Sequence, residues 1–203
     1  MVPHPSRGSD VFMRERVALA LSAVVHEVGL RQLSVSRIAK QAEMSPAAFY
    51  LLFENREAAV RYAVELGGAR LRGAIDDASG SGDPWEQRVE AVIQALLESA
   101  VAEPQLAELC LVLGRAVEGA PFPCDPALVQ ALAEVLRAGR SDASAVEAPP
   151  RTEEMISSGI LSVIADRLPL EEAGDLSELA GELSQLATEP FRTGSSPQRT
   201  RRI

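Results

Sequence analysis

Apolar residues recur at the three-to-four-residue spacing of an α-helix along most of the 203-residue chain. The first apolar stripe ends at Gly29, and a shorter one covers residues 35–42. At Ser45-Pro46, Asp83-Pro84 and Asp125-Pro126, a residue that caps helices stands before a proline, which the first helical position tolerates. No segment keeps the two-residue period of a strand. The pattern therefore predicts an all-α fold.

The same reasoning predicts the later helices. Asn55 can cap a helix that runs through residues 57–77, and further apolar stripes run from Trp85 to Ala100, from Leu106 to Val117 and from Leu128 to Leu136. Residues 139–150 are rich in Ser, Ala, Asp and Pro, which favours a loop.

The last two predicted helices differ from the others. Residues 155–168 are apolar on more than one face, and residues 176–186 carry a heptad-like leucine stripe, so a second copy of the chain is the expected partner. The alternative is a large monomeric core. The residues expected in the dimer interface are Ile156, Ile160, Val163, Ile164, Leu179, Leu183 and Leu186. Residues 1–9 and 193–203 are polar and are expected to be disordered tails.

Residues 34–57 hold two short helices separated by the three-residue turn 42–44. Small Ala39 allows a close approach of the second helix, and Met44 and Phe49 can fill the angle between the two. This spacing is that of a helix-turn-helix, whose second helix lies in the major groove of DNA.

At these residues the sequence resembles the TetR (tetracycline-repressor-like) family of transcriptional regulators. VVHEVGL (24–30) matches the end of that family's first helix, and LSVSRIA (33–39) its second. SPAAFYLLF (45–53) matches the recognition helix, and NRE (55–57) the start of the fourth helix. Towards the other end of the chain, residues 159–168 and 183–191 look like the dimerising helices of one branch of the family.

The resemblance implies two domains between the tails: a three-helix DNA-binding domain over residues 10–54, and a helical effector-binding and dimerisation domain over residues 55–192. It also implies that Ser34, Tyr50 and Arg56 hold DNA phosphates. Arg37 and Lys40 are candidates for further phosphate contacts, although a solvated helix face explains them equally well.

Four departures from the family pattern bear on DNA reading. The turn position usually held by glycine is Glu43, which costs about 1 kcal/mol if it is left-handed. Ser36 replaces a frequent arginine, and Leu52 stands where a polar ring is common. The recognition helix has no charged residue and so lacks the side chains that bind guanine or adenine bidentately. Thymine methyl groups and groove shape remain readable by Ser36, Pro46, Ala47, Ala48 and Leu51, with Ser45 at the start of the helix. We expect operators with A·T-rich half-sites and only modest specificity.

The charge of the chain is divided unevenly between its two parts. The formal net charge is -9, but residues 1–70 carry 9 basic and 7 acidic residues, which leaves 11 basic and 22 acidic residues beyond them. The first part is thus +2 and the second -11, so any contact with a polyanion is confined to the first.

By analogy with the family, helices within residues 85–140 surround a cavity for a small effector. The expected lining residues are Leu96, Ala100, Leu109, Cys110, Leu113, Val117 and Leu136, each of which could equally be plain core. Aromatic residues make up only 4% of the chain, which favours an aliphatic or small apolar effector over a planar drug.

The sequence contains little that suggests an enzyme. Its only histidines, His4 and His26, form no metal-ligand or nucleophile pattern, and no phosphate-binding glycine loop is present. Cys110 lies on an apolar stripe and is expected to pack as a small hydrophobe, with a thiol sensor as the alternative, although no cationic neighbour in sequence suggests an activated thiolate. The sequence does not decide whether Cys124 has such a role. No cofactor, metal, leader or membrane span is expected, which places the protein in the cytoplasm.

The sequence therefore predicts a dimeric, ligand-responsive repressor that binds a palindromic double-stranded DNA operator. The alternative is a helical dimeric interaction or sensor protein that keeps the fold but has lost specific DNA binding.

Overall fold

The computed structural model of the protein describes residues 7–80, 83–113, 125–142, 149–168 and 176–191, and every regular element in these ranges is helical. The predicted all-α fold is confirmed. The first part holds α1 (Arg7–Val28), the 3₁₀ turn η1 (Leu30–Gln32), α2 (Val35–Gln41) and α3 (Pro46–Leu52). The rest holds α4 (Arg56–Ser79), α5 (Trp85–Ala102), α6 (Pro104–Glu108), the π-helical turn η2 (Leu109–Leu113), α8 (Pro126–Asp142), α9 (Thr152–Arg167), α10 (Leu176–Thr188) and the 3₁₀ turn η3 (Glu189–Phe191).

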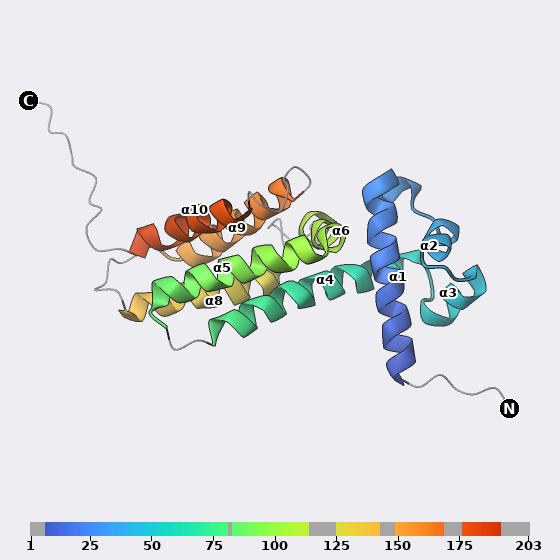
Figure 1. Cartoon of the computed structure of the whole chain (residues 1–203), viewed down its shortest axis with the longest axis horizontal. Coiled ribbons are helices and arrows are strands. Elements are labelled where there is room, and N and C mark those ends of the chain that lie inside the picture. Colours follow the sequence, from blue (N-terminus) through green and yellow to red (C-terminus); the bar gives the residue numbers. More distant parts are fainter. Residues whose placement is uncertain (1–6, 81–82, 114–124, 143–148, 169–175, 192–203) are drawn as a thin grey trace, which may run out of the picture.

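The molecule is elongated, with a small helical head at one end and a helical bundle at the other (Figure 1). In the head, α2 and α3 lie on the side of α1 that faces away from the bundle. Helix α4 leaves the head beside α1 and then runs along α5 and α8. Helices α9 and α10 cover the opposite side of the bundle, where α9 packs on α8 and α10 packs on α5.

Two hydrophobic cores correspond to the head and the bundle. The head core is built on Leu21, Ile38 and Phe49, and it also takes in Ala59 and Ala63 from the start of α4. Leu106 of α6 and Leu109 of η2 belong to this head core, although they are distant in sequence. Helix α4 and the α6–η2 segment therefore link the two cores physically.

Local capping explains most of the helix starts. The side-chain oxygens of Ser34, Ser45 and Asn55 accept hydrogen bonds from the amides of Arg37, Ala48 and Ala58. Asp125 Oδ1 likewise accepts from the amide of Ala127, 2.9 Å away, at the start of α8. Each cap satisfies an amide that the helix itself leaves unpaired, so the predicted starts at these four residues are confirmed.

Three predicted boundaries are wrong. Asp83 does not cap α5: the extended ψ of 146° at Pro84 makes that proline the N-cap, and no side-chain bond caps the helix. Helix α8 continues through Asp142 into the predicted loop at 139–150, since a glycine inside an anchored helix costs only about 1 kcal/mol. Helix α1 begins at Arg7, inside the predicted tail at 1–9. The predicted tail at 193–203 lies outside the described residues.

The stripe predicted from Leu106 to Val117 is not one regular helix. Five residues of α6 pass into a π-helical turn over Leu109–Leu113, which changes the helical period in mid-stripe. Val117 lies outside the described residues. Across the described ranges, no helix combines the length and apolarity needed to cross a bilayer.

Candidate nucleic-acid interface

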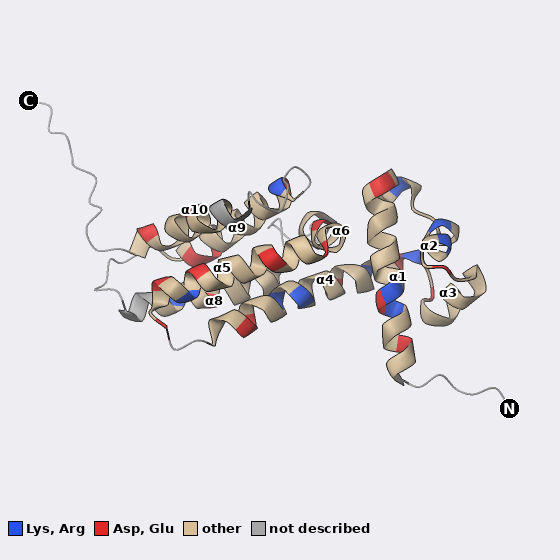
Figure 2. Ribbon diagram, viewed as in Figure 1, with Lys and Arg blue, Asp and Glu red and all other residues tan. Residues whose placement is uncertain are grey.

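Helix α3 presents an uncharged face to solvent at the end of the molecule far from the bundle (Figure 2). Phe49 is completely buried in the head core and holds the helix in place. On the other side, Pro46 and Ala47 are exposed, Tyr50 is 57% exposed and Leu51 is 87% exposed. Such an apolar, solvent-facing surface on a short, firmly anchored helix suits contact with thymine methyl groups in a major groove.

The other predicted DNA-contact residues belong to the α2 region and to the start of α3. Ser34, Ser36, Arg37 and Lys40 of the α2 region are all exposed, whereas Ala48 at the base of α3 is partly covered. The Ser34 oxygen, like that of exposed Ser45, accepts a capping bond. A hydroxyl that accepts a bond still has its own hydrogen to donate, so both serines remain able to bind a phosphate oxygen.

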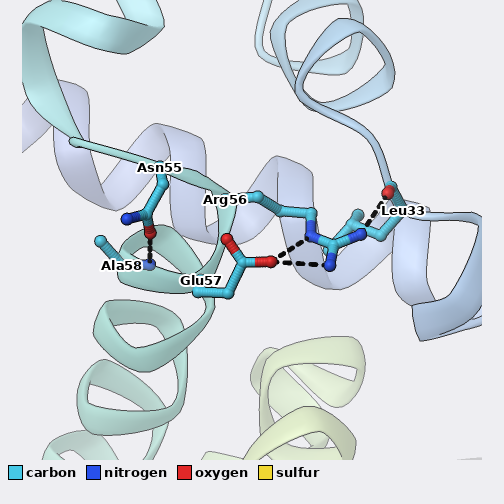
Figure 3. Close-up of polar contacts among 5 residues, drawn as sticks. All are labelled: Leu33, Asn55, Arg56, Glu57 and Ala58. Carbon is cyan, nitrogen blue, oxygen red and sulfur yellow. Dashed lines mark hydrogen bonds and ion pairs between the residues drawn. The ribbon is translucent and has the colours of Figure 1, made fainter.

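Arg56 is the first residue of α4, and its guanidinium already has protein partners (Figure 3). Nη1 donates to the backbone oxygen of Leu33 at 3.0 Å, while Nε and Nη2 donate to Glu57 Oε1 at 3.0 and 2.7 Å. A hydrogen bond from its own backbone amide, followed by the contact with Arg56, lowers the pKa of the Glu57 carboxyl. Arg56 therefore joins the start of α4 to the residue before the cap of α2.

The turn between α2 and α3 contains a residue with left-handed backbone geometry. Glu43, at the position that the family pattern gives to glycine, has φ of 51° and is therefore left-handed. Arg16 of α1 donates from Nε to the backbone oxygen of Ala42 at 2.8 Å and from Nη2 to that of Glu43 at 3.1 Å. Sequence reasoning missed Arg16, because only the unexpected Glu43 hints that the turn needs outside support.

The predicted effector-lining residues fall within the hydrophobic cores. Leu96, Ala100, Cys110 and Leu136 are buried in the bundle core, and Leu109 is buried in the head core. The side chain of Leu113 and all of Val117 lie outside the described residues. A pocket of about 300 Å³ opens between α8 and α9, where it is lined by other residues, namely Pro126, Val129, Gln130, Arg151 and Glu154. The effector site itself remains a prediction.

The predicted dimer residues divide into two sets. Ile160, Ile164, Leu179 and Leu183 are buried in the core of a single chain, as the alternative of a monomeric core requires. Ile156 and Val163 are half-buried, whereas Leu186 of α10 is 64% exposed. Met155 of α9, which was not among the predicted interface residues, is 70% exposed. The dimer remains a prediction. Among the side chains of α9 and α10 whose burial is described, Leu186 and Met155 are the exposed large apolar ones.

Polar contacts join the head to the α6 region. His26 Nδ1 of α1 lies 2.8 Å from Glu108 Oε2 of α6. Arg70 of α4 pairs with Glu103, just before α6, and its Nη2 is 3.7 Å from Glu15 Oε2 of α1. Arg70 therefore links α4 to α1 and to the residue before α6, and His26–Glu108 is a second, separate contact between α1 and α6.

Comparison with known proteins gives independent information on this fold. Residues 20–63 match the family model of the bacterial regulatory proteins of the tetR family. No curated protein sequence matches the chain.

Three solved structures show the likeness over the whole fold. A tetR-family regulatory protein from Rhodococcus RHA1 is 16% identical, with a TM-score of 0.70 over 93% of this chain and 98% of that one. The fatty acid degradation regulator FadR from Bacillus halodurans is 22% identical, with a TM-score of 0.65 over 85% and 96%. The TetR family transcriptional regulator PfmR from Thermus thermophilus is 17% identical, with a TM-score of 0.67 over 86% and 97%.

The capped helix pair, its exposed second helix and the attached bundle have the arrangement found in helix-turn-helix transcription regulators. The resemblance of residues 24–57 to the TetR family is confirmed: the chain has the TetR-like fold, and residues 20–63 match the N-terminal domain of that family.

Proposed function

We propose that this protein is a ligand-responsive repressor that binds a palindromic operator as a homodimer and is released by a small apolar effector. The observation that carries the proposal is α3, whose buried Phe49 anchors a solvent-facing surface of Pro46, Ala47 and Leu51. Two copies of this helix, held about 34–36 Å apart in a dimer, would enter successive major grooves. Repression follows when a bound dimer blocks transcription.

Selection from a randomised duplex library tests the DNA-binding part of this proposal. The uncharged face of α3 leads us to expect two A·T-rich half-sites related by a two-fold axis, with affinity that falls steeply with salt. Leu51→Asp is the informative variant, because it places a negative charge at an exposed position that the fold does not use. We expect this variant to stay folded and to lose the selected duplex, whereas G·C-rich half-sites would contradict the assignment.

Effector binding in the bundle would act on the head through the α6–η2 segment, which contributes side chains to both cores. Leu106 and Leu109 pack in the head core, while Cys110 next to them packs in the bundle core. An effector that displaces the α6–η2 segment would also strain the His26–Glu108 and Arg70–Glu103 contacts with the head. The effector then favours a dimer geometry in which the two recognition helices no longer match the operator spacing.

An aliphatic effector suits the composition of the bundle. Its core is mostly aliphatic, and the aromatic pair within it, Trp85 and Phe191, has ring centroids 5.6 Å apart. The structural neighbour FadR is named for the regulation of fatty acid degradation, which is compatible with an effector of this class. Thermal melts with straight-chain fatty acids of increasing length test the idea: a binder raises the melting temperature and, in a gel shift, releases the selected duplex.

The alternative is a dimeric interaction protein that has kept the fold without specific DNA binding. The observation in its favour is that α3 carries no charge, while Arg56 is engaged with Leu33 and Glu57. Under this alternative, selection enriches no sequence, and the protein remains dimeric in solution.

A further inference from the structure

The turn before α3 contains Glu43, a residue whose Cβ atom disfavours the left-handed backbone conformation that the turn adopts. Glu43, at φ 51°, donates from its amide to the Lys40 oxygen at 3.1 Å, and the Met44 amide donates to the Ala39 oxygen at 2.9 Å. These paired bonds form a Schellman motif, in which the left-handed position is usually glycine because a Cβ atom crowds the neighbouring carbonyl. The conformation at Glu43 therefore needs support from elsewhere in the fold.

Arg16 lies where it can supply that support. Its Nε and Nη2 both donate to the Ala42 oxygen, and Nη2 also donates to the Glu43 oxygen at 3.1 Å. These oxygens belong to the end of α2, where a helix has no further amides to offer its carbonyls. Val17 and Ala18, the next residues of α1, are completely buried, so the backbone that carries Arg16 is held in place.

We propose that Arg16 is a positioning residue for the DNA-reading helix, which compensates for the missing glycine at position 43. The planar guanidinium bridges two successive carbonyl oxygens, which belong to the peptides before and after the left-handed residue, and thereby stabilises that turn. The orientation of α3 follows from the turn, because Ser45, the cap of α3, is only two residues beyond Glu43. The effect of Arg16 on operator affinity rests on the proposed function, but the conformation of the turn can be measured without DNA.

Amide hydrogen exchange on the full chain, without DNA, tests the proposal directly. In Arg16→Ala we expect the Met44 amide to exchange about tenfold faster, because the left-handed turn is populated less. Adding Glu43→Gly to Arg16→Ala should bring the rate back to within about twofold of the parent, since glycine adopts this conformation without a steric penalty. In Arg16→Lys, the Met44 amide should exchange at a rate between those of the parent and Arg16→Ala, because an ammonium group cannot bridge both oxygens in the same way.

Arg14→Ala is the matched control for this measurement. Arg14 is on the same helix, but its guanidinium lies 5.2 Å from the centroid of the Phe53 ring and makes no hydrogen bond to the turn in the described structure. We expect its Met44 exchange rate to equal that of the parent. If the Arg16→Ala/Glu43→Gly double variant exchanges as fast as Arg16→Ala alone, Arg16 does not compensate for the missing glycine and the proposal is overturned.

A gel shift on the selected duplex then separates positioning from direct contact. A positioning role predicts about tenfold weaker binding for Arg16→Ala, recovery in the double variant and an unchanged slope of affinity against salt. A slope reduced by about 0.9 without recovery would make Arg16 a phosphate ligand and overturn the positioning role. If the exchange results hold but the parent selects no duplex, the proposed function fails and the positioning role stands.

Discussion

Arg56 Nη1 donates a hydrogen bond to the backbone oxygen of Leu33 at 3.0 Å, so a residue expected to bind a DNA phosphate also makes a contact within the folded head. The bond links the first residue of α4 to the segment that leads into α2 (Figure 3). If Arg56 also binds a DNA phosphate, as the sequence predicts, a single substitution there changes both the DNA contact and the geometry of the head.

Arg56→Ala should lower the free energy of unfolding by about 1 kcal/mol, because it removes a charge-assisted bond to a partly buried carbonyl. It should also reduce the slope of log affinity against log salt by about 0.9 if Arg56 binds one phosphate. Urea denaturation and a salt series of gel shifts measure the two effects. Arg56→Lys is the control: it keeps the charge and most of the salt slope but loses the bond to Leu33. An unchanged salt slope in Arg56→Ala would leave Arg56 with the structural role alone.

Tyr50→Phe should weaken operator binding about three- to tenfold, the effect of losing one hydrogen bond, with stability unchanged to within about 0.5 kcal/mol. The ring contact between Tyr50 and Phe49, whose centroids are 5.6 Å apart, survives the substitution. The matched control is Tyr62→Phe on α4, whose half-buried ring packs against Phe53. Equal operator affinity for Tyr50→Phe and the parent would remove Tyr50 from the interface.

Gly67→Ala should cost about 1–3 kcal/mol of stability, because the added methyl group overpacks the crossing of α4 with the α6–η2 segment. A Cβ at Gly67 would lie 2.9 Å from Cys110 Cβ and 3.0 Å from the Leu106 oxygen, and the backbone oxygen cannot move aside cheaply. Gly73→Ala on the same helix is the control. A Cβ there has no other atom within 4 Å, so this change should stabilise the protein by about 0.5–1 kcal/mol. Urea unfolding of the two variants gives their free energies of unfolding. Equal changes in Gly67→Ala and Gly73→Ala would contradict a tight crossing of α4 with the α6–η2 segment.

Leu186→Glu and Met155→Glu should each weaken the proposed dimer, because they place charge on the exposed apolar positions of α10 and α9. Sedimentation over a range of protein concentrations gives the dissociation constant. Phe12→Glu, at another exposed apolar residue on α1, should leave the dimer unchanged. If all three variants dissociate at the same concentration as the parent, α9 and α10 do not form the interface.

Glu57→Gln should remove part of the acid sensitivity of the head. The backbone hydrogen bond of Glu57 and its contact with Arg56 lower the pKa below its usual 4.5, so the stabilisation is present above that value and is lost as pH falls through the lowered pKa. Parent and variant should therefore differ in melting temperature at pH 7 and converge in strong acid. Glu65→Gln, an exposed residue on the same helix, is the comparison. A difference between parent and Glu57→Gln that persists at low pH would mean that the carboxylate charge is not its cause.

Predictions from the sequence succeeded where the cause was local. Ser34, Ser45 and Asn55 cap their helices because a cap needs only its own side chain and an amide three residues on. The predicted cap at Asp83 was wrong, because the ψ angle of Pro84 decides whether that proline is the first helical residue or the N-cap, and the sequence does not give this angle.

Predictions that depended on packing were less complete. Ile160, Ile164, Leu179 and Leu183 lie on regular apolar stripes, and a stripe indicates that a face is buried without indicating by what. In the structure, the single chain covers these four side chains. The same limit applies to Leu96, Ala100, Cys110 and Leu136, which the structure places in a packed core.

The sequence by itself determined the helical class, the helix-turn-helix spacing and an uncharged recognition helix, because period, capping and residue type act within a few positions. Only the tertiary structure decided that Arg16 binds the turn after α2, that Arg56 binds Leu33 and that α6 packs against the head. Each of these contacts joins residues at least 23 positions apart. Their meeting depends on how whole helices cross, which the order of residues along one helix does not specify.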